Sequence, residues 1–225
     1  MSTALGQLSD IRSTIWDGRR RRRSFLTQLP QGAEVLDVGC GNNTPYLTKS
    51  LRPDIRYVGL DVGDYRQTHD PKQYADEYLA VPADGFAAAI RERRNQFDAV
   101  ISSHNLEHCD DPDGVLVAMA QALRPGGRIY LAFPCAASMH MPSRDGTLNF
   151  WDDETHIRPP DFRRVIDLLR GEGVTVDFAV ERYRTVVRTA VGLFVEPVSR
   201  LRGKVMPGTW ALYGFESVIW GSRPA

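Results

Sequence analysis

Short apolar runs of strand length recur along the chain and alternate with segments of helical periodicity. The apolar runs predict strands near 34–38, 56–60, 78–81, 97–102, 128–133, 174–182 and 213–220. The periodic segments predict helices at 5–28, 44–51, 85–95, 114–123 and 161–170. Because strands and helices alternate and the strands are apolar throughout, we expect an α/β domain with a mostly parallel sheet and helices on both faces.

The most informative stretch, 35–42, predicts a buried strand that runs directly into a glycine turn. Gly39 and Gly41 allow the backbone to turn sharply and to lie close to a ligand. Asp37 stands near the carboxyl end of the strand, where open α/β sheets bind their ligands. A dinucleotide fingerprint would have a third glycine where Thr44 stands. The turn therefore favours a nucleoside ligand without a pyrophosphate.

Two further acids follow strands in the same way. Asp61 ends the second strand, about 20 residues after the glycine turn, where a carboxylate can accept hydrogen bonds from both hydroxyls of a ribose. Asp84 precedes Gly85 in the loop after the third strand. An ordinary turn or helix cap explains each acid equally well when it is taken alone.

Five segments in this order resemble the class I S-adenosylmethionine (SAM)-dependent methyltransferases; the last two are 97–108 and the Pro-Gly-Gly stretch 123–133. The resemblance implies a Rossmann-like three-layer fold with seven strands, of which the last is antiparallel. It implies SAM as cofactor, with Asp37 at the methionine end, Asp61 on the ribose and Asp84 at the adenine. The full set of cofactor-binding residues that it implies is Asp37, Gly39, Cys40, Gly41, Asp61, Val62, Asp84, Gly85, Ser102 and His104.

Composition narrows the function classes. The 225 residues suit one domain, which we divide into an N-terminal helical cap (1–30) and the SAM-binding domain (31–225). The 28 basic and 28 acidic residues balance, so no general attraction to nucleic acid is expected. Three scattered cysteines fit neither a disulfide framework nor a thiolate zinc site. No signal peptide or apolar span is evident, and a cytoplasmic location is expected.

Histidine is the residue best suited to take a proton from an acceptor hydroxyl at neutral pH. His104 and His108 flank Glu107, but no third metal ligand is evident and we predict no metal. A Leu-Glu-His run is common at this place in the resembling family, which favours a structural or SAM-lining role. His156 lies in the polar, aromatic loop 136–160, which we expect to present the acceptor. We predict His156 as the catalytic base or an acceptor-binding residue; the alternative is that it only orders the loop.

Two segments fall outside the family pattern. The run Arg19–Arg23 predicts a solvated face with one inward arginine, which the resemblance would place on the SAM carboxylate; phosphate, anionic lipid and RNA are alternatives. The helical insertion 185–206 carries an apolar stripe with basic residues, and Pro197 should kink or split its helix. Such a stripe more often packs on its own domain or a second subunit, and contact with an anionic membrane is the alternative.

These patterns together predict a SAM-dependent methyltransferase that methylates an oxygen of a small polar metabolite, sugar or glycolipid. Two alternatives remain open: a SAM-binding subunit that activates another enzyme without catalysis, and an NAD(P)-dependent oxidoreductase. Methylation of nucleic acid has no support, because no RNA-binding module is recognisable and 102–105 is not an amine-methylating motif. Homodimerisation and peripheral membrane contact are the partner interactions that the insertion raises.

Overall fold

The computed structural model describes residues 20–225, so Arg19 and most of the predicted leading helix lie outside the described residues. The strands are β1 (Glu34–Val38), β2 (Arg56–Asp61), β3 (Glu77–Ala80), β4 (Phe97–Ser103), β5 (Leu123–Pro134), β6 (Thr175–Val180) and β7 (Glu216–Ser222). The helices are α2 (Arg22–Thr27), α3 (Thr44–Leu51), α4 (Phe86–Arg91), α5 (Pro112–Ala122), α6 (Phe162–Gly171), α7 (Val186–Arg202) and α8 (Thr209–Tyr213).

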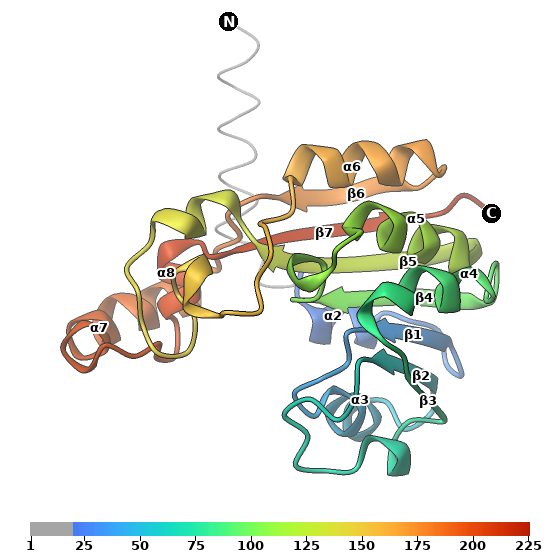
Figure 1. The fold of residues 1–225 in the computed structure, drawn as a ribbon, viewed down its shortest axis with the longest axis horizontal. Coiled ribbons are helices and arrows are strands. Elements are labelled where there is room, and N and C mark those ends of the chain that lie inside the picture. Colours follow the sequence, from blue (N-terminus) through green and yellow to red (C-terminus); the bar gives the residue numbers. More distant parts are fainter. Residues whose placement is uncertain (1–19) are drawn as a thin grey trace, which may run out of the picture.

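The described strands form one seven-stranded sheet in the order β3-β2-β1-β4-β5-β7-β6. The pairs among β1 to β5 are parallel, and β7 runs antiparallel to both β5 and β6. This confirms the predicted fold class, including the antiparallel last strand. The carboxyl ends of the parallel strands therefore share one edge, and α7 and α8 lie beyond that edge (Figure 1).

Alternation along the strands divides the core between the two faces of the sheet. Leu36 and Val38 of β1 belong to the cluster that is covered by α4, α5 and α6. Val35 belongs to the opposite cluster, which Phe25 and Leu26 of α2 help to form. Since side chains of a strand alternate between faces, Asp37 faces the same side as Val35, toward α2.

Most predicted boundaries agree with the structure to within a few residues, and α3 agrees at both ends. The largest difference among the strands is at β5, which begins at Leu123 and not near 128, and the last strand begins at Glu216 and not near 213. The preceding segment forms the short helix α8, which ends at Gly214 in the left-handed region (φ 66°). Pro197 lies inside α7 without splitting it, so the predicted split of this helix is wrong and the predicted kink stays a prediction.

The loop 136–160 and the insertion 185–206, which the sequence left separate, fold against each other. Arg144 is buried and makes a bidentate ion pair with Glu196 of α7, with N–O distances of 2.9 and 2.6 Å. Its Nη1 also donates to Ser199 Oγ at 2.7 Å, and Tyr213 donates to Glu196 at 2.6 Å. These contacts make one structural unit of the loop, α7 and α8.

The apolar stripe of α7 is exposed, so the expectation that it packs on its own domain is wrong. The exposed fractions are 74% for Val187, 86% for Phe194 and 89% for Leu201. The inward side of α7 carries Gly192 instead, whose Cα meets the backbone of Gly208 so closely that a Cβ would clash. No helix within residues 20–225 combines the length and the apolar character needed to cross a bilayer.

We predict that Arg144→Ala lowers the free energy of unfolding by about 3 kcal/mol, because it leaves the Glu196 carboxylate without its main partner. Arg164→Ala is the matched control, since Arg164 pairs with Asp113 on the surface and the expected loss is about 0.5 kcal/mol. Urea denaturation measures both values. Equal losses in the two variants would contradict the structural role of Arg144.

Candidate functional site

A cavity of about 260 Å³ opens at the carboxyl ends of β1, β2 and β4. Its walls are the glycine turn, the end of β2, the start of α4 and the polar turn after β4. The lining residues are Gly39, Gly41, Asn42, Asp61, Val62, Tyr65, Ala83, Phe86, Ser103, His104, Asn105, His108, Cys109 and Thr155. This is the place where open α/β sheets bind their ligands.

The glycine turn lies directly against the turn that follows β4. Gly39 has a positive φ of 78°, and a Cβ on it would lie 2.5 Å from the Cβ of Asn105. Only glycine fits there without a shift of the neighbouring backbone. The amide of Gly39 donates to the carbonyl of Leu60 at 2.8 Å, which fixes the turn to β2. The turn therefore holds the ends of three strands around the cavity.

Asp61 is the buried acid of the cavity wall. One of its carboxylate oxygens accepts the amide of Val62 at 2.7 Å. Burial raises the pKa of Asp61 to about 6, although hydrogen bonds from the backbone of Val62 and Gly41 favour the ionised form. At neutral pH this carboxylate is an acceptor facing a cavity, where a ligand with hydroxyl donors can bind.

Five of the predicted cofactor-binding residues line this cavity: Gly39, Gly41, Asp61, Val62 and His104. The other five are near it but do not line it: Asp37, Cys40, Asp84, Gly85 and Ser102. Ser102 is buried and donates to the carbonyl of Val38, and Asp84 is exposed to solvent beside the cavity. Ala83 of the short 3-10 helix Ala83–Gly85 and Phe86 at the start of α4 line the cavity instead and offer an apolar surface.

Two side chains of the protein bind the carboxylate of Asp37. It accepts Arg22 Nη2 at 2.6 Å and the Tyr57 hydroxyl at 2.6 Å, and the same Arg22 nitrogen contacts Thr48 Oγ1 at 2.7 Å. Among Arg20–Arg23, more than one arginine turns inward: Arg22 pairs with Asp37, Arg20 lies over the ring of Trp220 and Arg21 lines the second cavity described below. The contact of one arginine of the run with the SAM carboxylate stays a prediction.

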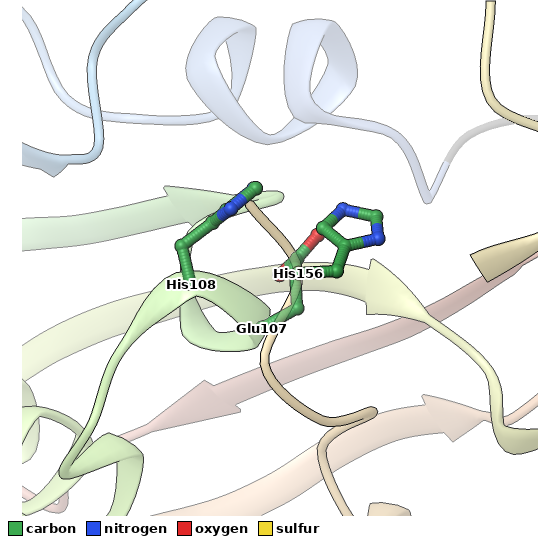
Figure 2. A group of neighbouring side chains, drawn as sticks. All are labelled: Glu107, His108 and His156. Atoms are coloured by element: carbon green, nitrogen blue, oxygen red, sulfur yellow. The ribbon is translucent and has the colours of Figure 1, made fainter. Parts of the chain in front are cut away.

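His156 does not line the cavity, whereas His108 and Thr155 do. The His156 side chain lies beside His108 (Figure 2). Its ring packs between Phe150 and His108, with centroid distances of 4.4 and 4.7 Å. Its Nδ1 lies 2.5 Å from the carbonyl oxygen of Phe150. Since a carbonyl only accepts, Nδ1 carries the hydrogen and Nε2 keeps its lone pair. His156 is therefore held in the tautomer that leaves Nε2 basic.

The predicted set of cofactor-binding residues lacks several residues that line the cavity: His108, Ser103, Asn105 and Thr155. His108 joins the loop 136–160 to the cavity, because its Nδ1 lies 3.2 Å from the carbonyl oxygen of Thr155. Ser103 Oγ is buried and has no hydrogen-bond partner among residues 20–225. The signal for Ser103, Asn105 and His108 is their place at or directly after the end of the fourth strand, and the signal for Thr155 is its place in the loop 136–160.

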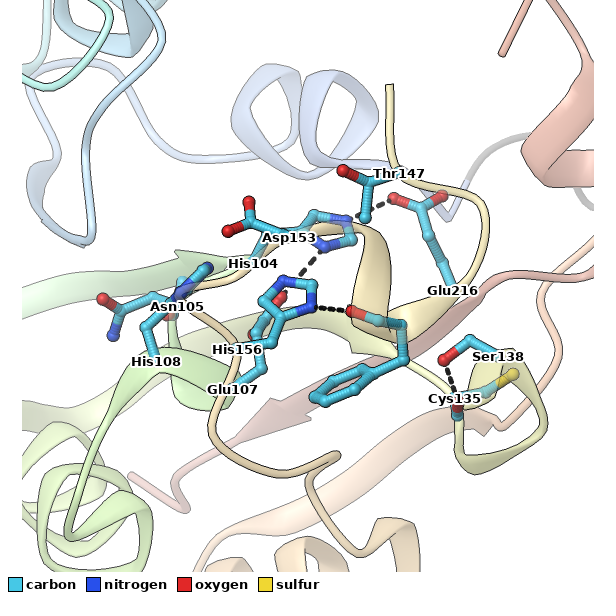
Figure 3. Close-up of polar contacts among 12 residues, drawn as sticks. His104, Asn105, Glu107, His108, Cys135, Ser138, Thr147, Asp153, His156 and Glu216 are labelled. Atoms are coloured by element: carbon cyan, nitrogen blue, oxygen red, sulfur yellow. Dashed lines mark hydrogen bonds and ion pairs between the residues drawn. The ribbon is translucent and has the colours of Figure 1, made fainter. Parts of the chain in front are cut away.

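His104 is held between two carboxylates (Figure 3). Its Nδ1 lies 3.2 Å from Glu107 Oε1 and its Nε2 lies 3.0 Å from Glu216 Oε1. Burial alone would lower the pKa of His104, but hydrogen bonds and charge from Glu107 and Glu216 outweigh burial and raise it to about 10. His104 is therefore charged at neutral pH and has no free lone pair, which excludes it as a base.

A second cavity, of about 350 Å³, lies beyond this ion pair. Glu216 and Trp210 line it together with two arginines, Arg21 and Arg188. Trp210 packs on the ring of His104 with a centroid distance of 5.1 Å. Burial and the neighbouring charge of Arg21 lower the pKa of Arg188. Although burial opposes the shift, His104 and the charges of Arg21 and Arg188 lower the pKa of Glu216. The cavity therefore sets two cationic side chains against one carboxylate.

Comparison with known proteins decides the family. The family described as a methyltransferase domain matches residues 12–177, which is most of the chain. The chain belongs to the class I SAM-dependent methyltransferases. This family uses SAM as its cofactor.

Among curated proteins, the chain is 31% identical over 106 residues to the ubiquinone biosynthesis O-methyltransferase of Pseudomonas putida (strain W619). That match covers 45% of this chain and 44% of the relative, so less than half of the curated protein is spanned. The corresponding enzyme of Aeromonas salmonicida (strain A449) is 32% identical over 107 residues, with 45% and 43% covered.

Solved structures share the fold at low identity. A SAM-dependent methyltransferase from Mesorhizobium loti has a TM-score of 0.62 at 17% identity, over 92% of this chain and 99% of that one. One from Archaeoglobus fulgidus has a TM-score of 0.55 at 18% identity, over 96% and 94%. A chain from the complex between the Haloferax volcanii Trm112 methyltransferase activator and a methyltransferase has a TM-score of 0.61 at 18% identity, over 100% of this chain and 96% of that one.

We predict that His104 makes stability depend on pH in the alkaline range. The unfolded chain releases the His104 proton near pH 6.5, whereas the folded protein keeps it until about pH 10. The stabilisation is therefore fully present below about pH 6.5 and is lost as the pH rises through about 10. Urea denaturation at pH values between about 6.5 and 10 should show that the free energy of unfolding falls more steeply with pH for the wild type than for His104→Gln. His140→Gln, at an exposed site, should follow the wild type, and parallel curves for all three proteins would contradict this role.

Proposed function

We propose that this protein binds SAM in the first cavity and transfers its methyl group to an oxygen of a small polar acceptor. The observation that carries the proposal is Asp61, a buried carboxylate that faces the cavity directly beside the glycine turn. Membership of the methyltransferase family makes SAM the ligand to which this geometry is matched. The binding of SAM and the transfer itself are what the experiments below test.

The residue chemistry supports one orientation of SAM. The ribose hydroxyls donate to the carboxylate of Asp61, as carboxylates at this strand position do for ribose. Val62, Ala83 and Phe86 supply the apolar surface for the adenine. The glycine turn and the unpaired hydroxyl of Ser103 receive the polar methionine end. The exposed Asp84 stays a prediction as a partner of the adenine amino group.

The acceptor approaches from the unit formed by the loop 136–160, α7 and α8. Arg21 and Arg188 in the second cavity favour an acceptor that carries an anionic group. The exposed stripe of α7, with Phe194 and Leu201, favours a lipid-linked acceptor or peripheral contact with a cytoplasmic membrane. The O-methyltransferase names of the curated relatives support oxygen as the atom that is methylated.

Methyl transfer to a hydroxyl needs a group that takes up the proton. The bond between the methyl carbon and the SAM sulfur breaks as the bond to the acceptor oxygen forms, and the oxygen loses its proton. We assign this proton to His156, whose Nε2 is free and whose ring packs on His108 of the cavity wall. His104 cannot take this role because it is already protonated. General-base catalysis of this kind contributes roughly 10²–10⁴-fold to a rate.

We predict that Asp61→Asn weakens SAM binding at neutral pH by about 10- to 100-fold, because a charge-assisted hydrogen bond is worth about 1.5–3 kcal/mol. Binding to the wild type should also weaken as the pH falls through about 6, where Asp61 becomes protonated. Isothermal titration calorimetry between about pH 5 and 8 measures both effects. Asp64→Asn is the control, since Asp64 is exposed and does not line the cavity. Unchanged affinity in Asp61→Asn would remove Asp61 from the ribose site.

The acceptor class is tested with methyl-labelled SAM, the purified protein and a cell extract, followed by organic–aqueous partition of the label. Label in the organic phase would identify a lipid or lipid-linked acceptor, and label in the aqueous phase a soluble one. Absence of transfer in both phases would contradict a catalytic function and favour the alternative of a SAM-binding partner subunit.

In the same assay, His156→Ala should cut turnover at least about tenfold while SAM affinity stays near the wild-type value. The reason is that His156 acts on the acceptor side and does not line the SAM cavity. His140→Ala, an exposed histidine of the same loop, should leave turnover unchanged. Full turnover in His156→Ala would rule out the assigned role.

A further inference from the structure

Glu107, His108 and His156 bring one carboxylate and two imidazoles together next to the cavity (Figure 2). Their potential ligand atoms all lie within 4.8 Å of one another. Glu107 and His108 come from the turn after β4, and His156 comes from the loop before α6. A backbone hydrogen bond of 2.9 Å from Ile157 to Glu107 joins the two segments. The grouping is therefore built by the fold and not by chance rotamers of free surface chains.

Both imidazoles are oriented by their second nitrogen. His156 Nδ1 donates to the carbonyl of Phe150 at 2.5 Å, and His108 Nδ1 lies 3.2 Å from the carbonyl oxygen of Thr155. A carbonyl accepts only, so both Nδ1 atoms carry hydrogen and both Nε2 atoms present lone pairs. Histidines that bind metals are held in this way, with the other ring nitrogen donating to a carbonyl or carboxylate.

Glu107 supplies an unexplained buried acceptor. Its side chain is fully buried, and Oε1 is paired with His104. Oε2 has no hydrogen-bond partner among residues 20–225. An unsatisfied buried oxygen normally costs about 1–3 kcal/mol, and a carboxylate oxygen costs more. A cation beside Oε2 would remove that cost.

We propose that Glu107, His108 and His156 bind a divalent transition-metal ion, with Zn²⁺ as the preferred ion. Two imidazoles and one carboxylate form a donor set of catalytic zinc sites, which leave one coordination position open. Mg²⁺ and Ca²⁺ favour sites made of oxygen ligands alone and fit less well. The sequence predicted no metal because no third ligand was evident near His104 and His108. In the folded chain His156 supplies that ligand. His104 is not part of the proposed set, because its two ring nitrogens face Glu107 and Glu216.

This inference rests on the proposed function and gives it a further step. His108 lines the cavity, so an ion bound to it adjoins the space that the acceptor enters. An ion held by these residues would lower the pKa of an acceptor hydroxyl that reached it, so the proton could leave to water and direct proton uptake by His156 would not be needed. No electron transfer is involved. His156 would then act on the acceptor as a metal ligand, although it does not line the cavity.

The test uses the full chain without an affinity tag, stripped of metal by a chelator and then titrated with Co²⁺ and with Zn²⁺. Visible absorption of Co²⁺ and equilibrium dialysis of Zn²⁺ should show one ion per chain in a four- or five-coordinate site. His108→Gln and His156→Gln should each weaken binding at least about tenfold. His140 is exposed and His69 stacks on Tyr46, and neither belongs to the proposed site. The control variants His140→Gln and His69→Gln should therefore bind the metal ion as the wild type does.

Wild-type protein that binds neither ion, or histidine variants that bind as well as the wild type, would overturn the proposal. Circular dichroism of the variants separates loss of a ligand from loss of the fold. Titration of the metal-free protein with SAM keeps the two proposals distinguishable, because SAM should bind without the ion. If the histidine variants lose turnover although the wild-type protein binds neither ion, the metal site is excluded and the direct base role of His156 remains.

Discussion

The close approach of Gly39 to Asn105 is the constraint on which the site depends. It brings the turn after β1 against the turn after β4, at a distance that no side chain larger than hydrogen permits. The turn after β4 carries His104, Glu107 and His108, so their positions relative to the glycine turn follow from this contact. The parallel order β2-β1-β4 adds Asp61 from the neighbouring strand. One steric condition thus sets both the cofactor cavity and the acceptor side.

Buried charges hold the surrounding segments in place. Arg22 with Asp37 fastens α2 to β1, and Arg144 with Glu196 fastens the loop 136–160 to α7. His104 joins the turn after β4 to β7 through Glu216. Each pair connects residues far apart in the sequence, where apolar packing alone leaves orientation loosely defined. These polar pairs therefore fix how the segments that they join are positioned relative to one another.

The sheet could be predicted from the sequence because its strands are short, apolar and followed by recognisable turns. Asp61 and the glycines were predictable for the same reason, since a strand end fixes their place. The role of Asp37 was less accessible: alternation along β1 turns it toward α2, where Arg22 meets it. The grouping of His108 with His156 was not predictable, because it depends on how the loop 136–160 folds back over the turn after β4. No local pattern encodes that return, nor the exposure of the stripe on α7.

A crystal structure of the protein with S-adenosylhomocysteine, the demethylated product of SAM, is the most direct test of the site. We expect both ribose hydroxyls on the carboxylate of Asp61, the adenine beside Phe86, and the sulfur directed toward the side of the cavity that His108 lines. A nucleoside bound elsewhere, or one whose ribose makes no contact with Asp61, would contradict the assignment of this cavity.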